Sequence, residues 1–289
     1  MGEIGYKGFK KGLICRDKQY EENTVYEEKK AIICKKGMHY CKNPFNVLDH
    51  YDLVNEDGSF NEFATVEPLA EEYTDDNKKY CTTKLRIGAK LGLSGFVKAC
   101  VDFVLEKTTV SIGDTDMNDN GERNAQIGSS GNYAKIGSSG NSAQIGSSGN
   151  SAKIGSSGNY AQIGSSGNSA QIGSSGNYAQ IGSSGNSAQI GSSGDSAKIG
   201  SSGNYAQIGS SGYCAQIDST GEDAVIMCAG HDSKVKAKKG SFITLAEWTY
   251  SEEKGRYVPA NVKTEKVDGE NIKEDTFYML KDGVFVEVE

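Results

Sequence analysis

A nine-residue repeat fills the middle of this 289-residue chain and constrains its fold more than any other feature. An isoleucine returns at every ninth position, an alanine lies two residues before it, and the residues between are nearly the same in each unit. Such fixed self-similarity predicts a repeat architecture in which stacked units share one core. The isoleucines of this core ladder are Ile127, Ile136, Ile145, Ile154, Ile163, Ile172, Ile181, Ile190, Ile199, Ile208, Ile217 and Ile226.

The spacing of alanine and isoleucine favours a strand over a helix. Side chains two residues apart share one face of a strand, whereas on a helix they point in nearly opposite directions. Glycine and serine fill four positions of each unit and further disfavour a helix. We therefore predict a β-solenoid whose units each contain a strand, Tyr/Ser-Ala-Gln/Lys-Ile, and a Gly-Ser-Ser-Gly corner with glycine at positive φ. Two or three units per coil are both compatible with the sequence.

The regions beside the repeat predict a mainly β protein with a capped solenoid. We place an N-terminal α+β domain at residues 1–107, a polar linker at 108–124, the solenoid at 125–235 and a small C-terminal β domain at 236–289. Both ends of a solenoid need such caps, because an uncovered sheet edge invites pairing with other chains.

Local signals specify the elements of the N-terminal domain. Asn43 followed by Pro44 predicts the start of a helix. A second, amphipathic helix is expected at 94–107 with Ser94 as its N-cap, and we expect it to cover the N-terminal end of the solenoid.

In the C-terminal domain, residues 241–248 and 276–288 have the composition of strands. The dipeptide Asp282-Gly283 within the second segment indicates a hairpin turn.

Charge placement argues against nucleic acid as a partner of the repeat. The chain has a formal net charge of −7, yet residues 125–217 contain no charged side chains besides Lys135, Lys153, Lys198 and Asp195. A DNA mimic needs acidic columns and a DNA-binding surface needs basic ones, because both depend on phosphate electrostatics. No stretch is apolar enough for a membrane helix, and the N-terminus has no secretory signal, so we expect no membrane association.

Metal and cofactor sites are not expected. Asp116, Asn118, Asn120 and Gly121 match the start of a calcium loop, but Ile127 occupies the position of the required glutamate, which favours a polar connector. Cys34, His39, Cys41 and His50 lie close in sequence without the spacing of a zinc site, so burial in the core is the favoured interpretation. Pairing of Cys15 with His39 as a nucleophile is the weakest of these possibilities.

Outward-facing side chains of the repeat are the candidate binding residues. They are expected to form a ladder of tyrosines and amides that either recognises a partner or stiffens the sheet by stacking. An ice-binding face is disfavoured because the outward column is bulky and partly charged and lacks threonine pairs. The candidate residues are Tyr133, Tyr160, Tyr178, Tyr205, Gln144, Gln162 and Gln180.

Several segments outside the repeat resemble an uncharacterised family of phage and prophage proteins from Firmicutes that contain nonapeptide arrays. The matching segments are Tyr6-Lys-Gly-Phe9, Cys15-Arg16, Lys36 to Phe45 with Tyr51, Leu245-Ala-Glu-Trp248 and Asp275 to Gly283. The arrays of that family are richer in Thr-Gly-Asp-Tyr-Ser-Ala-Ala than this one. The resemblance implies a phage gene expressed in a bacterium, and it implies no mechanism.

Together these observations predict a non-enzymatic, phage-encoded scaffold that binds a protein of the bacterial host. The phage context suggests inhibition of a host defence factor as its role. The seven cysteines, odd in number and irregular in spacing, suggest a reduced protein of the host cytoplasm. Homo-oligomers are compatible with the pattern. Two alternatives stay open: a virion or surface fibre element, and an enzyme with an ADP-ribosyltransferase-like pocket near His39 and Tyr40.

Overall fold

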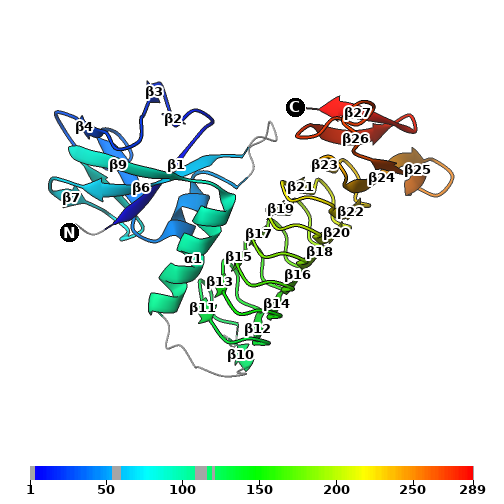
Figure 1. Cartoon of the computed structure of the whole chain (residues 1–289), viewed down its shortest axis with the longest axis horizontal. Coiled ribbons are helices and arrows are strands. Elements are labelled where there is room, and N and C mark those ends of the chain that lie inside the picture. Colours follow the sequence, from blue (N-terminus) through cyan, green and yellow to red (C-terminus); the bar gives the residue numbers. More distant parts are fainter. Residues whose placement is uncertain (1–3, 54–59, 108–115, 119–120, 289) are drawn as a thin grey trace. The chain divides into compact units, whose positions relative to one another are not determined.

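The computed structural model describes residues 4–53, 60–107, 116–118 and 121–288 (Figure 1). The chain forms two compact units, Met1–Phe103 and Val104–Glu289, which divide within the helix α1 (Leu93–Lys107). Within the described residues, no helix is both long and apolar enough to cross a membrane.

The N-terminal unit is built on one antiparallel sheet whose seven strands have the order β4-β9-β6-β1-β5-β8-β7. Its core contains Phe9, Met38 and Leu85, all almost fully buried. Because β1 pairs with both β5 and β6, segments distant in sequence meet at the centre of this sheet. The strands of the unit are β1 (Gly5–Phe9), β2 (Ile14–Cys15), β3 (Lys18–Gln19), β4 (Val25–Glu27), β5 (Met38–Cys41), β6 (Glu62–Pro68), β7 (Glu72–Tyr73), β8 (Lys79–Thr82) and β9 (Lys84–Leu91).

Both helices expected in this region are present, and the start of the second differs from the prediction. The first is a 3₁₀ helix, η1 (Pro44–Asp49), and the side chain of Asn43 accepts a hydrogen bond from the Phe45 amide at 3.0 Å as its N-cap. Helix α1 begins at Leu93, so Ser94 lies inside it and the prediction of Ser94 as the N-cap was wrong. The Gly92 carbonyl accepts the first bond of the helix, from the Phe96 amide at 2.9 Å.

Helix α1 packs on the N-terminal sheet through stacked aromatic rings. Phe96 lies 3.8 Å from Phe63 of β6, measured between ring centroids, with the rings nearly parallel. The apolar face expected on this helix is therefore used within its own unit. That the helix also covers the end of the solenoid stays a prediction.

The repeat forms a β-solenoid with two nine-residue units in each coil, which settles the alternative left open by the sequence. Each strand between residues 126 and 219 pairs in parallel with the strand 18 residues later, for example Ile145 with Ile163 and Ile154 with Ile172. Two sheets result, which we call the first and the second solenoid sheet, with orders β10-β12-β14-β16-β18-β20-β22-β24-β25 and β11-β13-β15-β17-β19-β21-β23-β26-β27.

In Figure 1 the strands of the two sheets follow one another from β10 and β11 to β22 and β23. The strands of the first sheet are β10 (Asp116–Asn118), β12 (Lys135–Ser138), β14 (Lys153–Ser156), β16 (Gln171–Ser174), β18 (Gln189–Ser192), β20 (Gln207–Ser210) and β22 (Val225–Cys228). Those of the second are β11 (Gln126–Ser129), β13 (Gln144–Ser147), β15 (Gln162–Ser165), β17 (Gln180–Ser183), β19 (Lys198–Ser201), β21 (Gln216–Ser219) and β23 (Lys234–Lys236).

The strand and the corner of each unit are displaced from the predicted positions. The strands are Gln/Lys-Ile-Gly-Ser, two residues later than expected, and the corners are Ser-Gly-Asn-Tyr/Ser-Ala. Positive φ occurs at the tyrosine or serine, such as Tyr160 at 59° and Ser169 at 56°, and not at the corner glycine. The corner position needs glycine because neighbouring coils approach closely there. A Cβ at Gly176 would stand 2.0 Å from the Gly158 carbonyl oxygen.

The interior of the solenoid is the predicted aliphatic ladder. All twelve repeat isoleucines are buried, with exposed fractions between 0 and 8%. The alanines from Ala134 to Ala224 are fully buried beside them. Each buried isoleucine is worth roughly 1.5–3 kcal/mol, so the stability of the array accumulates coil by coil.

Asparagine ladders along both edges reinforce the corners. The side-chain oxygen of Asn150 accepts a hydrogen bond from the amide of Asn168, one coil later, at 2.9 Å. Asn141 and Asn159 are joined in the same way at 2.9 Å on the opposite edge. These bonds satisfy corner amides that a strand ladder alone leaves without a partner.

The solenoid begins earlier than predicted, because β10 pairs in parallel with β12. Residues 116–118 are thus part of the first solenoid sheet, and the prediction that the polar linker extends through 124 was wrong. Asn120 of the calcium-loop pattern lies outside the described residues.

At the C-terminal end, both sheets continue into the cap domain. Strand β24 (Phe242–Ser251) pairs in parallel with β22 and then antiparallel with β25 (Arg256–Lys266), which the sequence pattern did not reveal. Strand β26 (Phe277–Lys281) joins β23 and forms the predicted hairpin with β27 (Val284–Val288). Asp282 and Gly283 both have positive φ, as a two-residue hairpin turn requires.

Candidate functional site

The outer face of the first solenoid sheet presents straight columns of equivalent positions from successive coils. One column contains Lys135 and Lys153 followed by Gln171, Gln189 and Gln207. A glycine column lies beside it, and an open groove runs along the glycines between the amide column and a column of serines. At four glycines of this column an added Cβ would meet no atom within 4 Å. They are Gly155, Gly173, Gly191 and Gly209.

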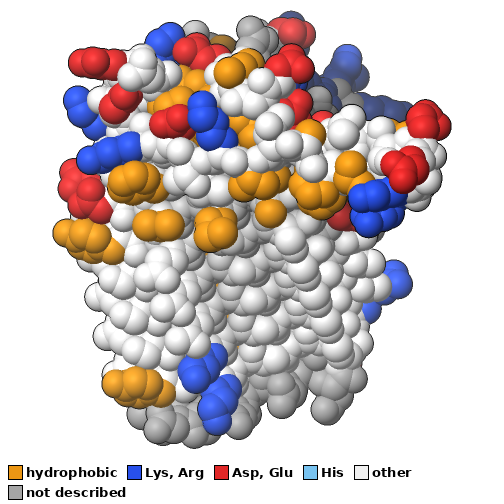
Figure 2. Space-filling model, turned by 90° about the vertical axis from the view of Figure 1, so that its right-hand side faces the viewer, with side chains coloured by type: hydrophobic (Ala, Val, Ile, Leu, Met, Phe, Trp, Pro, Cys, Tyr) orange, Lys and Arg blue, Asp and Glu red, His pale blue; other side chains and the backbone are white. Residues whose placement is uncertain are grey.

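Figure 2 shows this side of the molecule as a broad white area with few charged or hydrophobic side chains over the array. Basic side chains appear near its lower end. In the sheet, Lys135 pairs with Lys153 on the neighbouring strand. At the other end of the sheet the columns finish in exposed apolar residues, Val225 and Met227 on β22 and Phe242 on β24.

The two glycine columns of the repeat differ in what they do for the fold. Corner glycines such as Gly176 are required, because a Cβ would collide with the backbone of the previous coil. At Gly173 a Cβ would meet nothing within 4 Å. Glycine in a strand costs about 0.5–1 kcal/mol relative to alanine, so the folded chain gains nothing from the exposed column.

Gln144, Gln162 and Gln180, predicted as exposed binding residues, lie on the second solenoid sheet. Gln144 and Gln162 expose only 8% and 6% of their surface, so the expected exposure was wrong for them. Their amides form a ladder, in which Gln126 donates to Gln144 at 3.0 Å and Gln144 to Gln162 at 3.5 Å. Strands of alternate units lie on opposite sheets, and the sequence does not distinguish the two.

The four predicted tyrosines are exposed, but they do not form one ladder. Tyr133 and Tyr205 precede first-sheet strands and lie on one edge, separated by serine-bearing coils. Tyr160 and Tyr178 follow first-sheet strands and lie on the opposite edge, which we call the Tyr160 edge. There the two rings stack at 5.0 Å with an interplanar angle of 6°.

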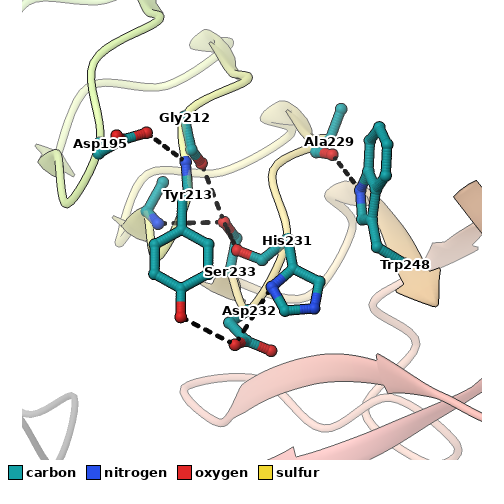
Figure 3. A network of polar contacts seen from close by, with 9 residues as sticks. Asp195, Gly212, Tyr213, Ala229, His231, Asp232, Ser233 and Trp248 are labelled. Atoms are coloured by element: carbon teal, nitrogen blue, oxygen red, sulfur yellow. Dashed lines mark hydrogen bonds and ion pairs between the residues drawn. The ribbon is translucent and has the colours of Figure 1, made fainter. Parts of the chain in front are cut away.

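Further aromatic side chains lie at the C-terminal end of the Tyr160 edge. Tyr213 stacks on His231 at 5.5 Å, and His231 contacts Tyr257 at 4.7 Å, both measured between ring centroids. As Figure 3 shows, Asp232 joins this group: it accepts a hydrogen bond from Tyr213 and lies 3.2 Å from the His231 Nδ1. Hydrogen bonds from Tyr213 to Cys214 and Asp232 raise the pKa of the Tyr213 hydroxyl to about 12.

Figure 3 also shows how this cluster is anchored to the array. The amide of Tyr213 donates to Asp195, which continues the asparagine ladder, at 2.9 Å. The single tryptophan, Trp248 of β24, donates from Nε1 to the Ala229 carbonyl at 2.9 Å. The cluster therefore stands at the junction of the last coils and the cap.

A separate cavity of about 430 Å³ lies within the N-terminal unit. Strands β1, β2, β3, β5 and β8 and helix η1 contribute to its walls, together with neighbouring loops. The side chains that line it include Lys7, Cys15, Arg16, Lys18, Tyr20, His39, Tyr40, Cys41, His50, Tyr51 and Lys79. The cavity thus lies where an enzyme pocket was considered, beside His39 and Tyr40, although nucleotide transfer there stays a prediction.

Cys15 and His39 both line this cavity, but their polar partners are other residues. The Cys15 sulfur lies 3.4 Å from the Lys7 Nζ and accepts a hydrogen bond from the Tyr51 hydroxyl at 3.1 Å. His39 accepts at Nε2 from the Cys34 amide at 2.9 Å. Burial, reinforced by the charge of Lys7, lowers the pKa of His39 to about 4, so the ring is neutral at pH 7.

The four residues weighed as a zinc site, Cys34, His39, Cys41 and His50, all line the same cavity. Even so, the described part of the chain contains no group of three or more potential ligands close enough to share a metal ion. Burial raises the pKa of the Cys41 thiol to about 12, which opposes formation of the thiolate that a metal needs.

Lys7 and Tyr51 are the residues that sequence reasoning missed as possible functional groups. Lys7 lies in the resembling segment Tyr6 to Phe9, and Tyr51 is itself one of the matching residues, so this was the available signal. Their spacing of 44 residues in the sequence gives no indication that they meet at one sulfur.

Comparison with family models gives a match in the N-terminal region of the chain. Residues 3–99 match the model of a family described as a domain of unknown function, DUF7666. This stretch corresponds to the N-terminal sheet and the first turns of α1. Comparisons with curated proteins and with solved structures gave no match.

Proposed function

We propose that this protein is a non-enzymatic binding scaffold, in which the solenoid holds a long, flat recognition face at the outer side of the first solenoid sheet. The fixed register of 18 residues supports this proposal, because it repeats the same contact group at each coil. A partner that makes one weak contact per coil gains affinity from every coil that it spans.

The exposed glycine column carries the proposal. The fold has no steric need for Gly155, Gly173, Gly191 and Gly209, and it loses stability by using them. A glycine inside a strand is typical of sites where another backbone or a ligand approaches closely. The groove above these glycines would admit such an approach, bounded by amides that offer both donors and acceptors.

The partner that we propose is a protein of the bacterial host. The groove is almost uncharged apart from Lys135 and Lys153 at one end, which favours a protein over nucleic acid. The phage context implied by the sequence resemblance suggests a host defence factor in the cytoplasm as the target. A virion or fibre role is the alternative, and detection of the protein in purified particles would support it.

Affinity capture from host cells, with face variants as controls, tests the proposal. We expect the full chain to retain a saturable partner, and a Gly155→Val, Gly173→Val, Gly191→Val variant to lose it while keeping its circular dichroism spectrum. A Tyr160→Ser, Tyr178→Ser variant should retain the partner, because these rings lie on the edge outside the groove. Equal recovery of the partner by the valine variant would contradict the proposal.

A further inference from the structure

The cavity of the N-terminal unit contains a buried cation. The side chain of Lys7 exposes 5% of its surface, and its Nζ donates to the His39 carbonyl at 2.9 Å. The same nitrogen lies 3.4 Å from the Cys15 sulfur and 5.4 and 5.6 Å from the ring centroids of Phe9 and Tyr20. The ammonium is therefore held by one carbonyl, one sulfur and two aromatic rings.

No carboxylate of the described residues forms an ion pair with Lys7. An ammonium has three donors, and the carbonyl and the sulfur account for two of them. Burying a charge without an opposite charge is costly, and in folded proteins such a group is usually paired. Burial accordingly lowers the pKa of Lys7.

The other charged groups around the cavity are mainly basic. Arg16, Lys18 and Lys79 line it beside Lys7, against the carboxylates of Asp17 and Glu28. Glu28 is paired with Lys18 at 2.9 Å, so its charge is already matched. The remaining charges leave the cavity with an excess of positive charge. Its volume lies within the range typical of small-molecule sites.

We propose that this cavity binds a small molecule through an oxyanion group, a phosphate or a carboxylate, that takes the third donor of Lys7. Arg16 and Lys79 supply further positive charge to the same anion, and the Cys15 thiol and the Tyr51 hydroxyl lie beside it. The bound anion provides the opposite charge that the protein itself does not place next to Lys7. This site is independent of the recognition face proposed for the solenoid.

Alkylation of Cys15 by the uncharged reagent iodoacetamide, followed by peptide mass spectrometry, reports on this cavity. The probes are inorganic phosphate and acetate up to 50 mM, at constant ionic strength maintained with sodium chloride. We expect one of the two anions to slow alkylation of Cys15 at least threefold. Cys214, a partly exposed cysteine of the solenoid, is the internal control and should react at an unchanged rate. The more protective probe identifies the anion group.

Two variants make the result specific to the buried cation. Lys7→Met keeps the length of the side chain and should abolish the protection of Cys15. If that variant does not fold, Arg16→Gln with Lys79→Gln should weaken the protection, while Lys98→Gln on the surface of α1 leaves it unchanged. The proposal would be overturned if neither anion protected Cys15 in the wild-type protein. It would also be overturned if the Lys7→Met protein kept full protection. Where Lys7→Met does not fold, full protection in the Arg16→Gln, Lys79→Gln double variant would have the same meaning.

Discussion

The solenoid and the N-terminal sheet build their cores from opposite kinds of neighbour. In the solenoid, Ile163 lies between Ile145 and Ile181, the same residue in the coils before and after. In the N-terminal sheet, Tyr6 pairs with Cys41 on one side and Thr65 on the other, residues from unrelated segments. Repetition gives uniform faces with few special groups, whereas the irregular sheet surrounds a cavity with a unique set of side chains.

This difference suggests how each unit can carry a function. A uniform face can bind an extended partner through many equal contacts, none of which needs an unusual residue. A cavity such as that around Lys7 instead depends on a few groups whose positions are set by several strands. Substitutions should therefore act differently in the two units, and four pairs of substitutions test the comparison.

The largest contrast is expected between two glycines of one repeat. Gly176→Ala places a Cβ against the Gly158 carbonyl and should destabilise the solenoid by more than about 3 kcal/mol or prevent its folding. Gly173→Ala enters open space and should be neutral or stabilise by about 0.5–1 kcal/mol. Urea unfolding followed by the fluorescence of Trp248, which is bonded to the last coils, measures both. Equal effects of the two changes would refute the distinction between the glycine columns.

A core truncation in each unit tests whether the two units unfold separately. Ile181→Ala should lower the free energy of unfolding of the solenoid by about 2–5 kcal/mol, because the side chain is fully buried. Leu85→Ala, equally buried in the N-terminal sheet, should leave the transition of Trp248 in place. A shift of that transition by Leu85→Ala would show that the units unfold together.

Acid should destabilise the N-terminal unit through His39. Its folded pKa of about 4 lies below the ordinary value of 6.5, so between these values the unfolded chain binds a proton that the folded unit does not. Stability is therefore lost as the pH falls through this window, by about 1–2 kcal/mol for a half-buried ring screened by solvent. His39→Gln should move the acid midpoint of this unit downward, as measured by circular dichroism, whereas His231→Gln should not. An unchanged midpoint in His39→Gln would contradict this assignment.

The smallest effect is expected at one rung of an asparagine ladder. Asn168→Ala removes the acceptor for the Asn186 amide and should cost about 1 kcal/mol in the same urea experiment. Ser166→Ala, two residues earlier in the corner, is the matched control and should change stability by less than 0.5 kcal/mol, as is usual for surface changes. A loss at Asn168 no larger than at Ser166 would mean that the ladder is dispensable.

Much of the solenoid could be predicted because its signal is repeated. The alternation of alanine and isoleucine identified the inward face, and the Asp282-Gly283 turn identified the last hairpin. The position of the corner could not be derived in the same way. Glycine is suited both to positive φ and to close backbone contact, and here the contact with the neighbouring coil, visible at Gly176, explains it.

The candidate sites were less predictable than the fold. Assigning residues to faces required the number of units per coil, so Gln144 and Tyr160 were grouped with residues that lie on other surfaces. The cavity depends on strand order in the N-terminal sheet, since β1 brings Lys7 between residues of β2 and β5. Such long-range pairings leave no local pattern in the sequence.

Distance measurement between two spin labels tests the 18-residue coil most directly. Labels attached through an unnatural amino acid at positions 135 and 207 leave the seven native cysteines unchanged. These positions belong to one column and are separated by four coils, so their backbones should lie about 19 Å apart, in a narrow distribution. A broad distribution, or a mean distance clearly different from this value, would contradict the solenoid described here.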